Sequence, residues 1–178
     1  MAVLLRWLVM VAAVCSLLEL PAVLARQAAP RPGPARYYNP QFSSDGTKVI
    51  FESTRDGKYT IYSINLDGSG LRKLTDSLQD DAQPHWSPDG TLITFTRQVG
   101  GVSKVFVMDA DGRQPVRLTT DPANDSAPAW SPDGARLAFM SDRDMRASAD
   151  IYTMKATDGS DVQRITRAAV LPPRSLAI

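Results

Sequence analysis

The residues of this 178-residue chain best suited to chemistry are its aspartates, its arginines and one histidine. A serine hydrolase needs a nucleophile, a general base and an acid that orients the base. His85 is the single histidine, and the sequence has no Gly-x-Ser-x-Gly nucleophile motif. We therefore predict that the chain is not an enzyme, and we interpret His85 as a variable strand residue beside Trp86.

The aspartates lack the spacing of a calcium-binding loop. An EF-hand needs Asp-x-Asp/Asn-x-Asp/Asn-Gly with a distal glutamate, and aligning Gly112 with that glycine places Val107 at the first ligand position. The segment DRDMRASAD, residues 142–150, has acids without this spacing, and we interpret it as a solvated loop. Cys15 lies in the N-terminal leader, which leaves the mature chain without a thiol. The sequence therefore predicts no metal and no cofactor.

Arginine and aspartate residues recur at matching places along the chain. Ser53-x-Arg55 returns as Ser141-x-Arg143, and Asp81 returns as Asp125. Arg97 breaks the first of these patterns in the middle copy. The candidates for partner binding are Arg55, Asp56, Asp80, Asp81, Arg97, Asp125, Asp142 and Arg143. In the alternative interpretation, these arginines and aspartates pair between neighbouring repeats and fix the loops.

These candidates belong to a sequence repeat. The phrases PQFSSDG, PHWSPDG and PAWSPDG begin at Pro40, Pro84 and Pro128, at an interval of 44 residues. Each copy also holds apolar residues spaced by two, such as Ile93 and Phe95, and this spacing places both side chains on one face of a strand. Four clusters of this kind predict four short strands in each copy.

Asp-Gly pairs separate the first and second strand candidates of each copy. These pairs are Asp45-Gly46, Asp89-Gly90 and Asp133-Gly134. Asp-Gly between alternating apolar runs indicates a hairpin, because glycine takes a positive φ without a Cβ clash. Proline at the second position of Ser-Pro-Asp-Gly presets a type I turn. We therefore assign these residues a structural role in turns.

A four-stranded antiparallel unit of about 40–45 residues is the blade of a β-propeller. We predict an all-β fold of about three blades, in residues 37–76, 80–121 and 124–167. The segment DSAPAWSPDGARLAFMSDRD, followed by DIYTMKATDGSDVQRIT, resembles the WD-like repeat of TolB, the periplasmic Tol-Pal component. The same repeat occurs in propellers attached to prolyl-oligopeptidase-type peptidases. Since the resemblance implies a closed ring of about six blades, three repeats predict an open or partial propeller.

The first 25 residues resemble a secretory signal peptide. Arg6 precedes an apolar run from Trp7 to Leu18, and Val23 and Ala25 have the spacing of a cleavage site. Residues 26–36 are rich in proline and alanine and are expected to form an extended linker. We predict a periplasmic or secreted protein, and the alternative is a protein anchored in the membrane by an uncleaved leader.

A fourth copy would place a proline at position 175 and a tryptophan at 177, where the chain has Ser175 and Ala177. We interpret residues 168–178 as an irregular tail. Either the chain is a truncated product, or three-blade halves associate into a ring. An open array would expose apolar blade faces and favour self-association.

The formal net charge of +1 and the lack of like-charge runs argue against a nucleic-acid partner. In an antiparallel meander, the loops between second and third strands lie on the same face as the connections between blades. We call this the loop face, and it carries the candidate residues given above. We predict an exported, non-catalytic propeller segment that binds a protein or peptide there. The alternatives are the propeller portion of a secreted peptidase and a non-functional fragment.

Overall fold

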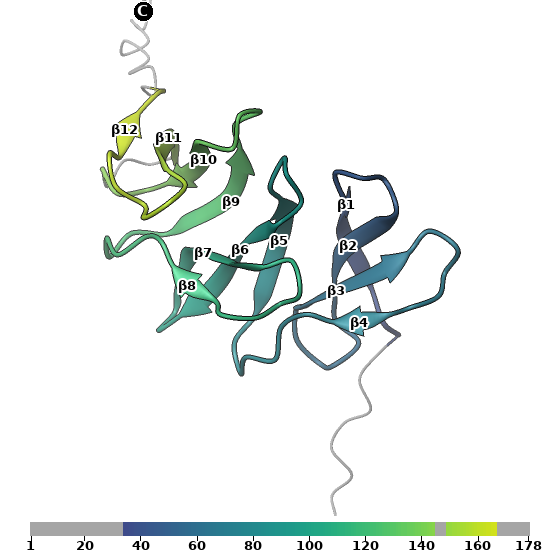
Figure 1. Ribbon diagram of the computed structural model, residues 1–178. Coiled ribbons are helices and arrows are strands. Elements are labelled where there is room, and N and C mark those ends of the chain that lie inside the picture. The colour runs from purple at the N-terminus through teal and green to yellow at the C-terminus, as the bar shows by residue number, and fades with distance from the viewer. Residues whose placement is uncertain (1–33, 145–148, 167–178) are drawn as a thin grey trace, which may run out of the picture. The chain divides into compact units, whose positions relative to one another are not determined.

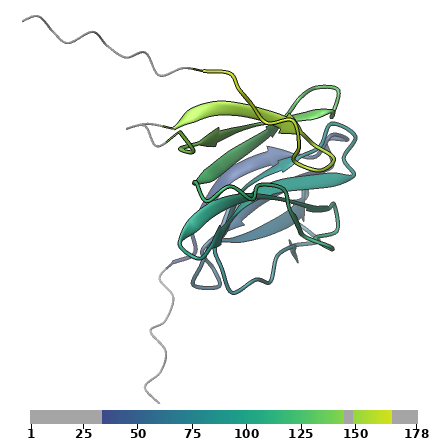
Figure 2. The ribbon, with the colours of Figure 1, turned by 90° about the vertical axis from the view of Figure 1, so that its left-hand side faces the viewer.

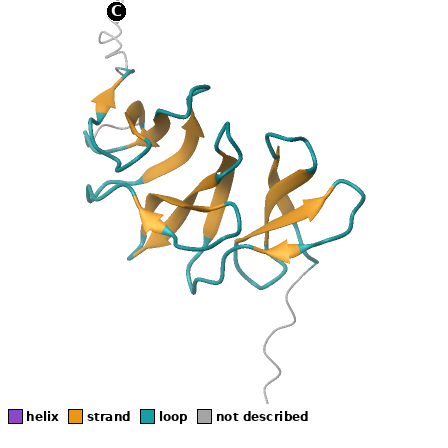
Figure 3. Ribbon diagram, viewed as in Figure 1, coloured by secondary structure: helices purple, strands orange, loops and turns teal. Residues whose placement is uncertain are grey.

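The computed structural model describes residues 34–144 and 149–166, which form strands, turns and loops (Figure 3). The predicted signal peptide with Cys15, residues 26–33 of the predicted linker and the predicted tail at 168–178 lie outside these residues. Within the described ranges, no helix is long and apolar enough to cross a membrane.

The strands form three four-stranded sheets, each an antiparallel meander (Figure 1). Blade 1 consists of β1 (Tyr37–Phe42), β2 (Lys48–Ser53), β3 (Thr60–Asn65) and β4 (Arg72–Lys73). Blade 2 consists of β5 (Asp81–Trp86), β6 (Leu92–Val99), β7 (Val102–Asp109) and β8 (Val116–Arg117). Blade 3 consists of β9 (Asp125–Trp130), β10 (Arg136–Ser141), β11 (Asp150–Lys155) and β12 (Gln163–Arg164). The predicted all-β fold of three four-stranded blades is confirmed.

The Ser-Pro-Asp-Gly sequence folds as a tight hairpin turn between the first two strands of a blade. In blade 2 the amide of Gly90 donates to the carbonyl of Ser87 at 2.9 Å. Gly90 has a φ of 72°, in the left-handed region that glycine enters without a steric cost. The Asp89 carboxylate accepts hydrogen bonds from the Ser87 hydroxyl at 2.6 Å and from the Thr91 amide at 3.1 Å. The same backbone hydrogen bond closes the turns of blades 1 and 3 at Gly46 and Gly134.

The first strand of every blade is interrupted by a bulge. Asn39, Gln83 and Ala127 lie at this bulge with φ values of 48°, 53° and 51°, and the register shifts beside each of them. The bulge turns two of these amides toward the preceding blade. The Gln83 amide donates to the Glu52 carboxylate, and the Ala127 amide donates to the Gln83 side-chain oxygen at 2.9 Å. The bulge therefore hydrogen-bonds blade 2 to blade 1 and blade 3 to blade 2.

The fourth strands are two residues long, and a Leu-Thr or Ile-Thr pair lies just beyond each of them. The Leu74 amide donates to the Ile61 carbonyl at 2.8 Å, and the Ile61 amide donates to the Thr75 hydroxyl at 3.1 Å. A threonine side chain thus replaces the backbone acceptor where regular pairing stops. Blades 2 and 3 repeat both contacts, through Leu118-Thr119 and Ile165-Thr166.

The hydrophobic core lies between the blades, which stack face to face (Figure 2). We call the face of a blade that packs on the preceding blade its leading face, and the opposite face its trailing face. Between blades 1 and 2, the buried side chains are Ile50, Ile61 and Leu74 on the trailing face and Ile93, Phe95, Phe106 and Met108 on the leading face. Between blades 2 and 3, Val105 and Leu118 pack on Leu137, Phe139, Tyr152 and Met154. Trp86 and Trp130 are partly buried and pack against these clusters.

The array of blades is open. Blade 2 contacts both neighbours, whereas no strand of blade 1 contacts a strand of blade 3 in the described residues. The leading face of blade 1 and the trailing face of blade 3 are therefore the two end surfaces of the array.

Candidate functional site

Asp81 and Arg97 form an ion pair inside blade 2. Asp81 is fully buried, and Arg97 binds both of its carboxylate oxygens, at 2.6 Å through Nε and at 3.0 Å through Nη2. The guanidinium lies about 5 Å from the ring centres of Phe95 and Phe106. A carboxylate this deeply buried requires a cation beside it, because isolated burial of a charge is very costly.

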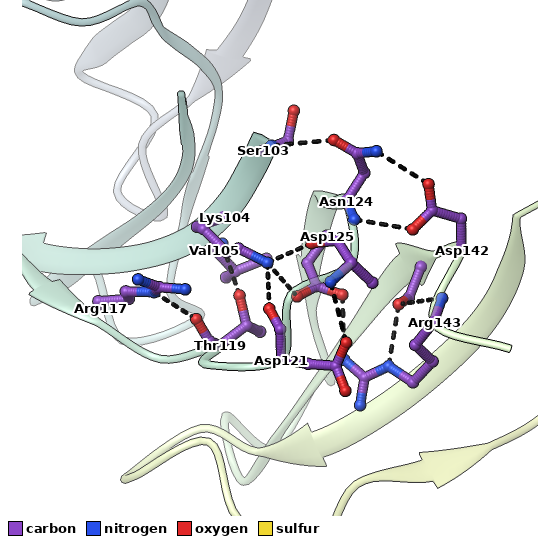
Figure 4. Close-up of polar contacts among 12 residues, drawn as sticks. Ser103, Lys104, Val105, Arg117, Thr119, Asp121, Asn124, Asp125, Asp142 and Arg143 are labelled. Atoms are coloured by element: carbon purple, nitrogen blue, oxygen red, sulfur yellow. Dashed lines mark hydrogen bonds and ion pairs between the residues drawn. The ribbon is translucent and has the colours of Figure 1, made fainter. Parts of the chain in front are cut away.

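Asp125 plays the same role in blade 3 and has two cationic partners (Figure 4). Arg143 Nη2 lies 3.0 Å from Oδ1, and Lys104 Nζ, from blade 2, lies 3.5 Å from Oδ2. Lys104 is almost completely buried and also donates to the carbonyls of Asp121 and Ala123. This lysine therefore ties blade 2 to the beginning of blade 3.

Arg97 and Arg143 occupy equivalent places in space but not in the sequence. Arg97 is part of β6 and stands opposite Asp81 in the register, whereas Arg143 follows the end of β10. Each guanidinium nevertheless lies over the aromatic pair of its own blade. The sequence does not show this equivalence, because Arg97 does not fit the Ser-x-Arg pattern to which Arg143 belongs.

Blade 1 has Tyr37 at the position of the buried aspartate. The Tyr37 ring packs edge-on against Phe51, with ring centres 5.7 Å apart, and Arg55 lies 5.4 Å from the centre of the Tyr62 ring. Asp56 accepts from the Tyr62 hydroxyl at 2.7 Å and pairs with Lys73 at 2.9 Å. These contacts lower the pKa of Asp56, while burial and the Asp56 hydrogen bond raise the pKa of Tyr62 to about 12. Among the described residues, Arg55 has no ion-pair partner.

The remaining candidates connect neighbouring segments of the loop face. Asp80 Oδ1 accepts from the Tyr59 amide of blade 1 at 2.8 Å. Asp142 accepts from the backbone and side-chain amides of Asn124, both at 2.8 Å (Figure 4). These two hydrogen bonds lower the pKa of Asp142. The candidate arginines and aspartates thus pair mainly within a blade, and Lys104 and Asp80 supply contacts between blades.

A polar pocket of about 340 Å³ lies at the loop-face ends of the strands. It is lined by Tyr59, Asp80, Ala82, Gln83, Thr96, Gln98, Ser103 and Ser126, from all three blades. Gln98 donates to Ser103 at 2.8 Å, and Thr96 donates to Gln83 at 2.8 Å. Within the described part of the chain, the hydroxyls of Tyr59 and Ser126 have no hydrogen-bond partner. The sequence pattern indicates none of these pocket residues apart from Asp80, because they do not recur between repeats.

His85 is a half-buried residue of β5, and burial lowers its pKa. Its backbone carbonyl accepts from the Trp130 indole of blade 3 at 3.3 Å. Among residues 34–144 and 149–166, no group of three histidine, cysteine, aspartate or glutamate side chains is arranged to hold a metal ion.

A family model described as the TolB beta propeller domain matches residues 32–104 and 97–171. Among solved structures, TolB from Acinetobacter baumannii is 29% identical with a TM-score of 0.65, and the match covers 74% of this chain and 32% of that chain. A putative TolB from Agrobacterium tumefaciens is 26% identical with a TM-score of 0.64, covering 74% of this chain and 48% of that one. The chain therefore spans less than half the length of either protein. No curated protein sequence matches it.

The same fold also occurs in peptidases. A puromycin-hydrolyzing peptidase from Mycobacterium tuberculosis is 23% identical with a TM-score of 0.61, and the match covers 75% of this chain and 24% of that chain. At this level of identity the match shows a shared fold, and propellers carry many unrelated functions.

Proposed function

Because the chain belongs to the TolB β-propeller domain family, we propose that it is a non-catalytic propeller segment that binds a protein or peptide partner on its loop face. The observation that carries the proposal is the polar pocket lined by all three blades. Its free hydroxyls on Tyr59 and Ser126 can donate and accept, as the backbone of an extended peptide requires. Ser126 lies in β9, and Tyr59 immediately precedes β3.

The buried ion pairs act as scaffold in this proposal. Asp81 and Asp125 are fully buried, and their arginines are already committed to them. A partner would have to break a buried pair to reach either carboxylate, at a cost of several kcal/mol, about 3–5. Binding is therefore expected at the polar pocket and at the more exposed Arg55, Asp56 and Asp142.

The test uses peptides selected from a displayed random twelve-residue library against the wild-type protein. The double variant Tyr59→Phe/Ser126→Ala removes two hydroxyls and keeps the shape of the pocket. We expect it to bind the selected peptides about 5- to 30-fold more weakly, as the loss of two hydrogen bonds predicts.

The matched control is Thr47→Ala, which removes a hydroxyl bound to Asp45 in a hairpin turn of blade 1. It should bind the same peptides with wild-type affinity. Equal affinities for the double variant and the wild type would show that the pocket is not the binding site.

We also propose that the protein acts outside the cytoplasm, at the cell envelope. The leader in residues 1–25 supports this, as does the resemblance to periplasmic TolB. Residues 1–36 fused to an alkaline phosphatase without its own signal should give an active enzyme, since that phosphatase requires export. Val11→Glu, which interrupts the apolar run, should abolish the activity. Activity that survives this substitution would contradict the export signal.

A further inference from the structure

The leading face of blade 1 has the features of a blade interface, and no other blade among the described residues packs on it. A pocket of about 460 Å³ lies there, lined by Tyr37, Tyr38, Pro40, Phe51, Arg55, Ile64 and Leu71. Tyr37 and Phe42 remain 60% and 68% exposed. The pocket residues Phe51 and Ile64 correspond to Phe95 and Met108 of blade 2, which are buried against the trailing face of blade 1.

The trailing face of blade 3 carries the complementary surface. Ile151 and Ile165 are 36% and 60% exposed there. The Ile165 amide donates to the Ile151 carbonyl at 2.8 Å, and Leu74 makes the same contact with Ile61 in blade 1. Ile61 and Leu74 are the side chains that pack on the leading face of blade 2. Blade 3 therefore presents the matching aliphatic pair on a face that no described residue covers.

We propose that two copies of this chain associate head to tail, with the trailing face of blade 3 of one copy packed on the leading face of blade 1 of the other. The second copy is the occupant because each copy carries both halves of an interface that already forms twice within the chain. Two copies of three blades give six, within the range of about four to eight blades in which propellers close. A head-to-tail contact that closes gives a defined dimer, while one that fails to close gives open chains.

This interface differs from the internal ones in one polar contact. Inside the chain, the bulge amide of the following blade donates to Glu52 or to Gln83. In the dimer, the bulge amide of Asn39 would face Ala127 and Met140, whose side chains are not acceptors. We therefore expect the dimer to dissociate on dilution. Ala127→Gln supplies a side-chain oxygen that can accept this hydrogen bond, as the side chain of Gln83 does inside the chain. Residues 83 and 127 have almost the same φ, and the variant should tighten the dimer several-fold.

The first test is the mass of the purified chain over a series of concentrations, by analytical ultracentrifugation. We expect a monomer–dimer equilibrium. Ile64→Asp and Ile151→Arg place a charge on opposite sides of the interface, and each should give a monomer. Leu78→Arg is the control, because Leu78 is 94% exposed in the connection between β4 and β5 and does not line the pocket on blade 1, so it should leave the dimer intact.

The decisive test mixes the two monomeric variants. The mixed dimer has one wild-type interface and one that carries both the introduced aspartate and the introduced arginine. Association of the mixture, with neither variant associating alone, is expected of a head-to-tail dimer and also shows that both variants fold. A wild-type chain that stays monomeric, a ladder of larger oligomers, a mixture that remains monomeric, or no gain from Ala127→Gln would overturn the proposal.

Discussion

Asp125 is the residue on which the polar contacts of blades 2 and 3 converge. Its carboxylate is fully buried and has a cation on each side, from Lys104 and Arg143. A buried ion pair adds little net stability compared with a well-packed apolar substitute, but removal of one partner leaves a buried charge uncompensated. This asymmetry makes the site sensitive to substitution.

Asp125→Ala is therefore expected to lower the free energy of unfolding by about 3–5 kcal/mol. The control Asp142→Ala removes a more exposed carboxylate that binds Asn124, and it should cost about 1 kcal/mol. Urea denaturation of the two variants and the wild type measures both changes. Similar losses for the two variants would mean that the buried Asp125 carboxylate contributes no more to stability than the more exposed Asp142 carboxylate.

The aspartates of the hairpin turns link stability to acidity. The Ser43 hydroxyl, followed by the amide and hydroxyl of Thr47, lowers the pKa of Asp45 to about 2 from an ordinary 3.8. Because the folded pKa lies below the unfolded one, the stabilisation is complete above pH 4 and disappears as the pH falls to about 2. Ser87 and Ser131 lower the pKa values of Asp89 and Asp133 in the same way.

Asp45→Asn should accordingly reduce the dependence of the unfolding free energy on pH between about 4 and 2. Ser43→Ala, which removes the strongest donor to that carboxylate, should reduce it in part. Denaturant titrations at a series of pH values provide the measurement. Parallel pH profiles for wild type and Asp45→Asn would show that Asp45 does not contribute to the pH dependence of stability.

At the scale of the element, the turns between third and fourth strands bring adjacent blades into close contact. A Cβ at Gly112 would overlap the backbone carbonyl of Leu74 in blade 1, and one at Gly159 would overlap that of Leu118 in blade 2. A Cβ at Gly46 would meet no atom within 4 Å. All three glycines have a positive φ, so they differ in their surroundings and not in their backbone conformation.

This difference gives a matched pair of substitutions. Gly46→Ala should cost about 1–2 kcal/mol, which is the strain of an L-residue in the left-handed region. Gly112→Ala carries the same strain and also pushes blade 2 away from blade 1, so we expect at least twice that loss. Thermal and urea unfolding measure both, and equal losses would show that the blades do not touch at Gly112.

The hairpin turns were predictable from sequence because their chemistry is local. An Asp-Gly pair after Ser-Pro specifies a turn whatever the rest of the chain does. The Asp81–Arg97 pair was not predictable, because the bulge at Gln83 sets the register that places these residues opposite each other. The polar pocket was missed for a related reason, since it combines residues of three blades whose positions share no sequence pattern.

At the scale of the whole molecule, blade 2 is packed on both faces while blades 1 and 3 are each packed on one. In repeat architectures, stability is approximately a sum of local terms and contacts between nearest neighbours. Blade 2 is therefore expected to be the most stable part of the monomer.

Native-state hydrogen exchange tests whether blade 2 is the most stable blade. The measurement uses the Ile151→Arg variant, which is expected to be monomeric. Amides of β6 and β7 should exchange more slowly than those of β2, β3, β10 and β11, because local opening of an end blade breaks one interface and not two. Uniform protection across the three blades would indicate a single cooperative unit.

The burial of Lys104 also has a consequence for chemical labelling. Acylating reagents modify accessible amines, and the Lys104 amine is 1% exposed, while Lys155 lies on an exposed position of β11. Acetylation by an activated ester should therefore modify Lys155 quickly and Lys104 only after blades 2 and 3 separate. Mass spectrometry measures the rate of acetylation at each lysine, and the rate at Lys104 would report how often blades 2 and 3 separate.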